Sequence, residues 1–320
     1  MILLTRGPPD EAEMFYVHAL GCSPDPARHA RGASMHVNVG LSCAGGRCVA
    51  NASGSVLTCA AARAGPLCQF HTASPLHEAA IASEGPQVWR GMITIAYQHD
   101  QLHAAIQRLK ALVAQPPLSS TKSKCAVRPA GDGLSYEVSC PYGNRFVLKA
   151  ASPREAQALS PSSGAGRPGS AASKALGFTS LALPCARGSS ASIGKFYSRC
   201  FGWPVTSSRC GVEMWGGPGG VQKLEFFEVD EPLPAYTGDH FCVYVPDLQQ
   251  TFEKCDAAGI VWVNPRFTHL DESRTWQDCE RYKQFRLLKL VDESGLTIQE
   301  QEHEIRMVTH PSYPLDQQVD

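Results

Sequence analysis

A short aromatic motif that occurs twice is the strongest constraint on the fold of this chain. Phe15-Tyr16 is followed after four residues by Gly21, and Phe196-Tyr197 is followed after four residues by Gly202. Each copy comes after a short apolar run and a polar stretch of the kind that starts a helix. In a chain of 320 residues, a repeat at this distance predicts an internal duplication and two domains of ordinary size.

A second pattern also occurs once in each half. Residues 91–97 and 241–245 have the composition of strands, and each run precedes apolar residues at helical spacing. A turn and a further strand are expected later, at residues 140–148 and 292–298. We therefore expect an α+β fold of four modules, each with a strand, a helix and two or three strands.

The chain divides at a segment rich in Gly, Ser and Pro. Residues 159–173 contain almost no side chains that could be buried, a composition typical of a flexible linker. We therefore predict a first domain at residues 1–150, a linker at 151–174, a second domain at 175–310 and a tail at 311–320. Residues 43–68 interrupt the first domain without periodicity. They are either a surface loop or intron sequence retained in a gene model.

Bulk composition excludes several classes of partner. The formal net charge is −1, so no general electrostatic attraction to nucleic acid or to an anionic membrane is expected. No apolar run is long enough to span a bilayer, and the N-terminus has no recognisable leader. We expect a cytoplasmic monomer or homodimer, unless the N-terminus is incomplete. The 13 cysteines are scattered without a CxxC pair, which favours small buried side chains in a reducing compartment.

The motifs together resemble the vicinal oxygen chelate superfamily of glyoxalases, bleomycin-resistance proteins and extradiol dioxygenases. The similar segments are Phe196–Gly202, Gly238–Leu248 and Cys140–Asn144. The resemblance implies two domains of paired βαβββ modules, each forming a curved, mostly antiparallel sheet around a cavity. It also implies metal ligands on the first and last strands of a module.

Carried over to this chain, the resemblance places a candidate site in the second half. The implied metal ligands are Glu225, His240 and Gln299, and Glu300 is the alternative presented by a strand bulge. A neutral imidazole and a carboxylate suit Zn²⁺, Fe²⁺, Mn²⁺ or Ni²⁺, and the resemblance to glyoxalases implies that a glutamine is tolerated among the ligands. Ser180 stands where the family has a further ligand, which argues against an extradiol dioxygenase and leaves a position open for substrate.

Other residues complete the predicted site. Tyr244 and Trp262 are candidates for lining the pocket, although aromatic residues at such spacings are more often in the core. Glu300 is the candidate catalytic base. We expect the polar run Glu302–Glu304 and His310 to lie past the last strand and to have a structural role. The first half contains no set of ligands at comparable spacing.

Two functions remain open at this stage. One is a metal-dependent lyase or isomerase that acts on a small oxygen-bearing molecule. The other is a non-catalytic protein of the bleomycin-resistance type, which binds a small molecule in the same cavity without chemistry.

Overall fold

The structure is a computed structural model, and it describes residues 2–3, 9–24, 36–39, 68–71, 88–116, 118, 123–159, 173–265, 267–268, 271–307 and 310. The predicted insertion, apart from Cys68, lies outside these residues. Most of the predicted linker and the predicted tail also lie outside them.

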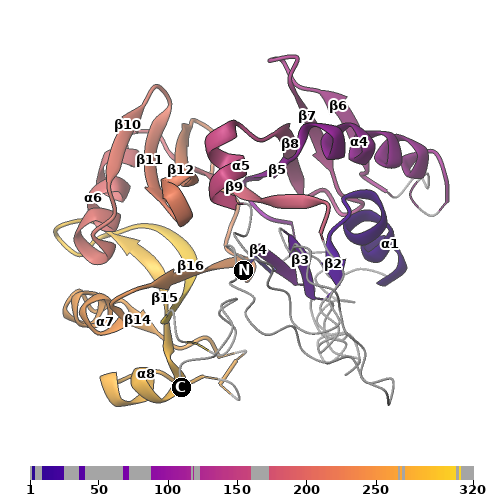
Figure 1. Cartoon of the computed structure of the whole chain (residues 1–320). Coiled ribbons are helices and arrows are strands. Elements are labelled where there is room, and N and C mark those ends of the chain that lie inside the picture. Colours follow the sequence, from indigo (N-terminus) through magenta and orange to yellow (C-terminus); the bar gives the residue numbers. More distant parts are fainter. Residues whose placement is uncertain are drawn as a thin grey trace, which may run out of the picture. The chain divides into compact units, whose positions relative to one another are not determined.

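The described elements follow one another as four modules of strand, helix and three strands (Figure 1). The first contains β1 (Ile2–Leu3), α1 (Pro9–Glu13) continued by the π-helix η1 (Met14–Ala19), β2 (Ser23–Pro24), β3 (His36–Val39) and β4 (Cys68–His71). The second contains β5 (Met92–Tyr97), α4 (His99–Val113), β6 (Ala126–Pro129), β7 (Ser135–Ser139) and β8 (Arg145–Ala150).

The third module contains β9 (Ala175–Ala186), α6 (Ser190–Phe201), β10 (Val205–Ser208), β11 (Gly211–Gly216) and β12 (Gln222–Val229), with a short 3₁₀ turn η3 (Pro218–Gly220). The fourth contains β13 (His240–Val245), α7 (Leu248–Ala257), β14 (Val261–Trp262), β15 (Gln284–Val291) and β16 (Thr297–Met307), with α8 (Trp276–Tyr282) between β14 and β15. This order confirms the predicted α+β class and the predicted succession of modules.

The chain forms two compact units that divide within β9. The N-terminal unit consists mainly of Leu3–Leu181 with Gly217–Gln222, and the C-terminal unit of Ala182–Gly216 with Lys223–Tyr313. No helix in the described part of the chain is long and apolar enough to cross a membrane.

One part of the predicted linker is helical rather than flexible. Helix α5 (Pro153–Leu159) starts with a reciprocal cap. The Glu155 amide donates to Ser152 Oγ at 3.2 Å, and the Ser152 amide donates to Glu155 Oε2 at 2.9 Å. Ser152 and Glu155 thus have the spacing of a capping box, with Pro153 at the first helical position.

In the N-terminal unit, the second module forms a sheet in the order β5-β8-β7-β6. Strands β5 and β8 are parallel, and the other two pairs are antiparallel. Helix α4 packs on this sheet through Leu102, Ile106 and Leu109. Strands β2, β3 and β4 form a separate antiparallel run within the same unit.

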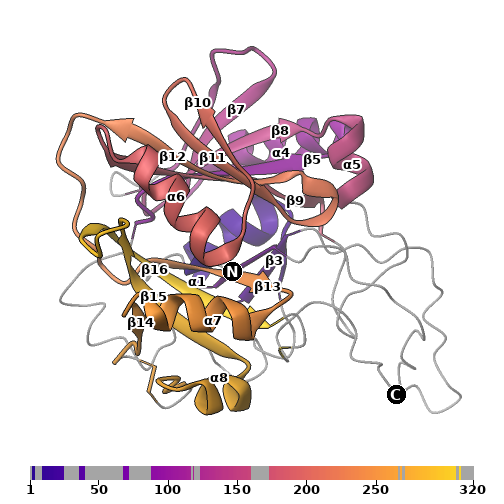
Figure 2. The ribbon, with the colours of Figure 1, turned by 90° about the vertical axis from the view of Figure 1, so that its left-hand side faces the viewer.

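In the C-terminal unit, the fourth module forms a sheet in the order β14-β15-β16-β13. Strands β13 and β16 are parallel, and the other pairs are antiparallel. Helix α7 lies along this sheet (Figure 2). Phe252 of α7 makes an edge-to-face contact with Phe285 of β15, with ring centroids 5.3 Å apart. Phe285 pairs in register with buried Ile305. The face covered by α7 is therefore the apolar one.

The repeated aromatic motif has the same local geometry in both copies. The rings of Phe15 and Tyr16 lie 5.0 Å apart at 88°, and those of Phe196 and Tyr197 lie 5.4 Å apart at 90°. All four side chains are buried. The glycine that follows each pair has positive φ, at 72° and 68° respectively. The motif therefore specifies a buried aromatic pair followed by a left-handed helix end.

Candidate functional site

Polar side chains cover the face of the β14-β15-β16-β13 sheet that is opposite to α7. Alternate residues of a strand point to one face, and residues paired across strands share that face. The register therefore defines a polar sheet face whose members are His240, Cys242 and Tyr244 of β13, Glu302, Glu304 and Arg306 of β16, Gln284 and Arg286 of β15, and Trp262 of β14.

Arg286 is the central cation of this face. Its Nε donates to Asp271 Oδ2 at 2.9 Å, its Nη1 to Glu302 Oε1 at 2.8 Å, and its Nη2 to Glu304 Oε1 at 2.7 Å. All four side chains are buried. Each guanidinium nitrogen thus binds a different carboxylate, an arrangement that fixes three acidic side chains around a single cation.

Arg306 extends the same network. Its Nη2 donates to Glu304 Oε1 at 2.7 Å, its Nε to Gln284 Oε1 at 3.1 Å, and its Nη1 to the Tyr244 hydroxyl at 3.3 Å. Burial opposes the ionisation of Glu304. The charges of Arg286 and Arg306 outweigh this effect and hold the pKa of Glu304 far below its usual range. Glu304 is therefore a carboxylate that is matched by two guanidinium groups.

His240 lies at one end of the polar sheet face, opposite Glu302 in the register. Its side chain is buried, and its Nδ1 is 3.1 Å from the Gly238 carbonyl oxygen and 3.7 Å from Glu302 Oε2. The short contact is consistent with Nδ1–H donating to the carbonyl oxygen. The carboxylate beside His240 is therefore Glu302, which is not among the predicted metal ligands.

Glu302 is already saturated with hydrogen-bond donors. Besides Arg286, it accepts from Asn264 Nδ2 at 2.9 and 3.1 Å and from the hydroxyl of Tyr236. A divalent ion shared by His240 and Glu302 would have to displace these donors and lie near the charge of Arg286. The residues around His240 therefore do not fit a metal centre. Across the described part of the chain, no three His, Cys, Asp or Glu side chains gather into a set that could hold one.

Glu225, a predicted metal ligand, is engaged in an ion pair on another sheet. Lys223 Nζ lies 2.9 Å from Glu225 Oε2 and 2.8 Å from Glu213 Oε1, and it sits 5.7 Å from the centre of the Trp215 ring. The two carboxylates outweigh the effect of burial and raise the pKa of Lys223. Glu225 therefore serves as a counter-ion for this lysine.

The remaining predicted residues have different environments. Gln299 is buried, with its Nε2 donating to the Pro184 carbonyl oxygen at 3.3 Å, while its Oε1 has no hydrogen-bond partner among the described residues. Glu300 is exposed and pairs in register with Lys289. Ser180 is partly buried, in the portion of β9 that belongs to the N-terminal unit. Tyr244 and Trp262 are both half-buried on the polar sheet face.

The polar run near the C-terminus lies within the last strand, contrary to the prediction. Residues 302–304 do not lie past the last strand, because β16 continues to Met307. Glu302 and Glu304 point to the polar sheet face, and His303 points to the opposite face. The alternation of acidic and other residues from Glu300 to Arg306 is the sequence signal that could have placed them in a strand.

His303 has a structural environment. The Tyr197 hydroxyl lies 2.5 Å from its Nε2, and the Gln301 carbonyl oxygen lies 2.7 Å from its Nδ1. Its ring centre is 4.4 Å from that of Phe241. Burial lowers the pKa of His303 to about 4, so the neutral ring donates to Gln301 and accepts from Tyr197. This buried hydrogen bond ties α6 to β16.

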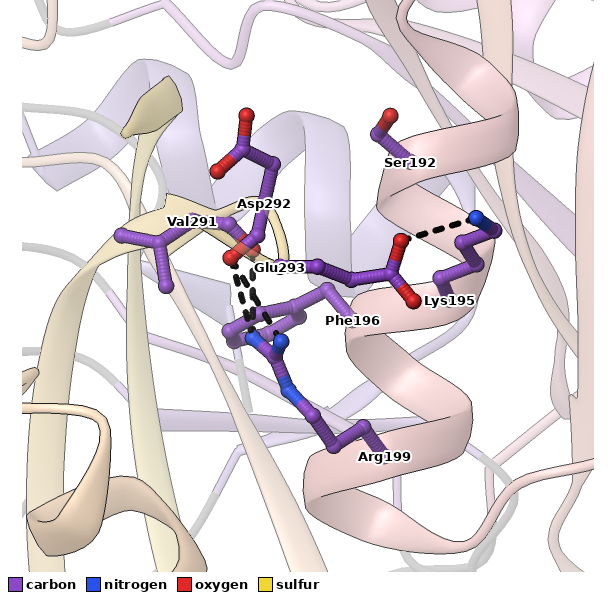
Figure 3. Close-up of a pocket in the computed structure, with 7 residues that line it drawn as sticks. All are labelled: Ser192, Lys195, Phe196, Arg199, Val291, Asp292 and Glu293. Atoms are coloured by element: carbon purple, nitrogen blue, oxygen red, sulfur yellow. Dashed lines mark hydrogen bonds and ion pairs between the residues drawn. The ribbon is translucent and has the colours of Figure 1, made fainter. Parts of the chain in front are cut away.

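A small surface pocket lies elsewhere in the C-terminal unit, between α6 and the β15–β16 turn (Figure 3). It is lined by Ser192, Lys195, Phe196, Arg199, Val291, Asp292 and Glu293. Lys195 Nζ lies 2.9 Å from Glu293 Oε2, and Arg199 Nη1 donates to the Asp292 carbonyl oxygen at 3.4 Å. None of the residues of the polar sheet face lines this pocket.

Comparisons with known proteins give structural similarities only. No family model matches the sequence, and no curated protein matches it. A putative dioxygenase from Bacillus subtilis is 14% identical over 94% of this chain and 82% of its own, with a TM-score of 0.49. Glyoxalase I from Zea mays is 11% identical over 96% and 90%, with a TM-score of 0.49. The 2,3-dioxygenase LapB from Pseudomonas sp. KL28 is 12% identical over 96% and 89%, with a TM-score of 0.28.

Proposed function

We propose that this chain is a non-catalytic, metal-independent small-molecule-binding protein with a glyoxalase-like fold, of the bleomycin-resistance type. The observation that carries the proposal is the state of Glu302. This carboxylate lies beside His240, yet Arg286, Asn264 and Tyr236 occupy its oxygens. Arg286 provides the positive charge that a metal ion would provide in a metal-dependent relative.

The binding surface that we propose is the part of the polar sheet face that is not fully buried. Tyr244 and Trp262 are half-buried there. The Tyr244 hydroxyl accepts a hydrogen bond from Arg306 at 3.3 Å, which fixes the phenol beside that guanidinium. An aromatic surface beside a few fixed polar groups is typical of small-molecule sites. A small oxygen-bearing ligand would contact the fixed Tyr244 hydroxyl and pack on Trp262.

A metal-dependent lyase or isomerase is the second candidate. One observation favours it: the buried Oε1 of Gln299 has no hydrogen-bond partner among the described residues. An amide oxygen in that state could bind a cation. The enzyme would use Glu225, His240 and Gln299 as ligands and Glu300 as base, and Glu225 would have to leave Lys223. Because this rearrangement breaks an ion pair on a second sheet, we favour the binding protein.

A ligand screen in the presence of EDTA tests the proposal. Wild-type protein is mixed with compounds that carry two adjacent oxygens, such as 2-hydroxy acids, 1,2-diketones and catechols, and its melting temperature is recorded. We expect at least one class to stabilise the protein without any conversion of the compound. Tyr244→Phe and Trp262→Leu should reduce the shift, whereas Tyr282→Phe, on α8, should not.

Two results would contradict the proposal. In one, stabilisation appears only after a divalent metal is restored, and the compound is then converted. In the other, Tyr244→Phe and Trp262→Leu both retain the full shift, which would place the binding site elsewhere.

A further inference from the structure

An aromatic side chain from outside the sheet lies over the polar sheet face. Phe267, in the connection between β14 and α8, is half-buried. The centre of its ring is 4.9 Å from the guanidinium carbon of Arg286. The same ring meets the His240 ring edge-to-face, with the two centres 5.9 Å apart and an angle of 76°. One aromatic ring therefore contacts both the central cation of the polar sheet face and the histidine at its end.

The chain on either side of Phe267 is tied to the same face by polar side chains. Asn264 Nδ2 donates to both carboxylate oxygens of Glu302, at 2.9 and 3.1 Å. Asp271 Oδ2 accepts from Arg286 Nε at 2.9 Å. Both anchoring side chains are buried, whereas Phe267 is half-buried. Rotation of the Phe267 side chain to another rotamer would therefore uncover the guanidinium without breaking either anchor.

Arg286 offers its flat face, rather than its edges, to a further group. Each of its three nitrogens already donates to a carboxylate, and these N–H bonds lie in the plane of the guanidinium. The face of a guanidinium suits a flat π system, whose ring face carries partial negative charge. Phe267 supplies such a ring, and its attraction to Arg286 needs no covalent link to the chain. A free aromatic molecule could occupy the same place.

The charge of the network disfavours an anionic ligand. The network contains two guanidinium groups and three carboxylates, which belong to Arg286, Arg306, Asp271, Glu302 and Glu304. An added carboxylate or phosphate would be repelled by acidic groups that already outnumber the guanidinium groups. It would also find the hydrogen-bonding edges of Arg286 occupied by those acidic groups. A neutral ring meets neither obstacle.

We propose that Phe267 occupies the place of the ligand's ring, and that the ligand of the polar sheet face is a neutral aromatic molecule of the phenol class. The ligand's ring displaces Phe267 from the Arg286 guanidinium and lies beside Trp262, which pairs in register with Arg286. Phe267 is then a specificity-determining residue, because a ligand has to compete with it for the guanidinium face. This inference rests on the proposed function, and it narrows the small oxygen-bearing ligand to one with an aromatic ring.

Fluorine NMR of the full chain tests the displacement. A single 4-fluorophenylalanine replaces Phe267, and the protein is titrated in EDTA with phenol and, separately, with cyclohexanol, which has a similar size but no π system. We expect phenol to shift the fluorine signal in a saturable manner. Broadening of the signal by a soluble paramagnetic chelate should increase at the same time, because the displaced ring is more exposed. Cyclohexanol should leave both readouts unchanged at the same concentrations.

A variant separates competition for the guanidinium face from a structural role. Phe267→Leu keeps an apolar side chain but removes the ring, so we expect it to bind phenol several-fold more tightly than the wild type does. The measurement is the line broadening of the phenol proton signals. Phe227→Leu, at a half-buried phenylalanine of β12, is the matched control and should bind phenol like the wild type. A purely structural role of Phe267 would give weaker or unchanged phenol binding.

The inference is overturned if the fluorine signal does not respond to phenol, or if it responds equally to cyclohexanol. It is also overturned if folded Phe267→Leu binds phenol no more tightly than the wild type. The proposed function survives these results when Tyr244→Phe and Trp262→Leu reduce the thermal shift given by another compound. If both variants keep the full shift with every compound, the proposed function is wrong as well. The fluorine experiment decides the point if Phe267→Leu fails to fold.

Discussion

At the scale of single residues, the decisive feature is the placement of Arg286 among three buried carboxylates. Its guanidinium binds Asp271, Glu302 and Glu304, and Glu302 in turn lies beside His240. Removing a cation of this kind from water costs free energy, and a buried carboxylate that loses its cation costs free energy as well. The residues that could have formed a metal centre instead stabilise one another.

Removing the charge of Arg286 should therefore destabilise the protein strongly. Arg286→Met keeps much of the side-chain volume but leaves three carboxylates without their common partner. We expect the free energy of unfolding to fall by about 3–5 kcal/mol, measured by urea denaturation. Arg281→Ala, at an exposed arginine of α8, is the control and should change it by less than about 0.5 kcal/mol. A small effect of Arg286→Met would mean that the carboxylates do not depend on this cation.

The lowered pKa of His303 predicts how the free energy of unfolding depends on pH. Its pKa is lowered to about 4 by burial, so between the unfolded value of 6.5 and pH 4 the unfolded chain binds more protons than the folded one. Stability should therefore fall as pH falls through this range, by on the order of 3 kcal/mol from this residue. His310, whose pKa burial also lowers to about 4, contributes with the same sign.

The measurement is the slope of the unfolding free energy against pH between 4.5 and 6.5. His303→Gln should make the slope shallower, whereas His99→Gln, at an exposed histidine of α4, should leave it unchanged. An identical slope in the His303 variant would show that this residue is protonated equally in both states.

At the scale of elements, β16 explains why the site differs from expectation. Leu287 pairs with His303, and Lys289 pairs with Glu300, so β16 has one extra residue between these two pairs. A bulge of this kind changes which residues share a face. The strand also continues beyond its predicted end, so Glu302 and Glu304 pair in register with His240 and Cys242 of β13.

The hairpin of β11 and β12 carries a prediction at this scale. A Cβ atom added to Gly211 would lie 1.9 Å from the backbone oxygen of Phe226, so a backbone shift is unavoidable. We expect Gly211→Ala to destabilise the protein by more than about 2 kcal/mol. Gly216→Ala, in the same strand with nothing within 4 Å, should be close to neutral. Equal effects in thermal melts would contradict this view of the hairpin.

At the scale of the whole molecule, the fold was more predictable than the site. Two local signals, the aromatic pair before a left-handed glycine and the strand before a helical pattern, were enough to predict the order of the modules. The contacts of Arg286 with three carboxylates could not be predicted, because they depend on the pairing of β15 with β16 and on a loop that supplies Asp271. Ser152 and Glu155 have the spacing of a capping box and therefore indicate the start of α5. The prediction of a flexible linker, which was based on Gly, Ser and Pro content, did not use this signal.

The central claim is that Arg286, and not a metal ion, supplies the positive charge beside His240 and Glu302. Calorimetric titration of EDTA-treated protein with Zn²⁺, Ni²⁺, Mn²⁺ and Fe²⁺, the last without oxygen, tests it most directly. The account predicts no stoichiometric binding that depends on His240, so wild type and His240→Ala should give the same weak heats. Binding of one ion per chain that is lost in His240→Ala would contradict it and favour the metal-dependent enzyme.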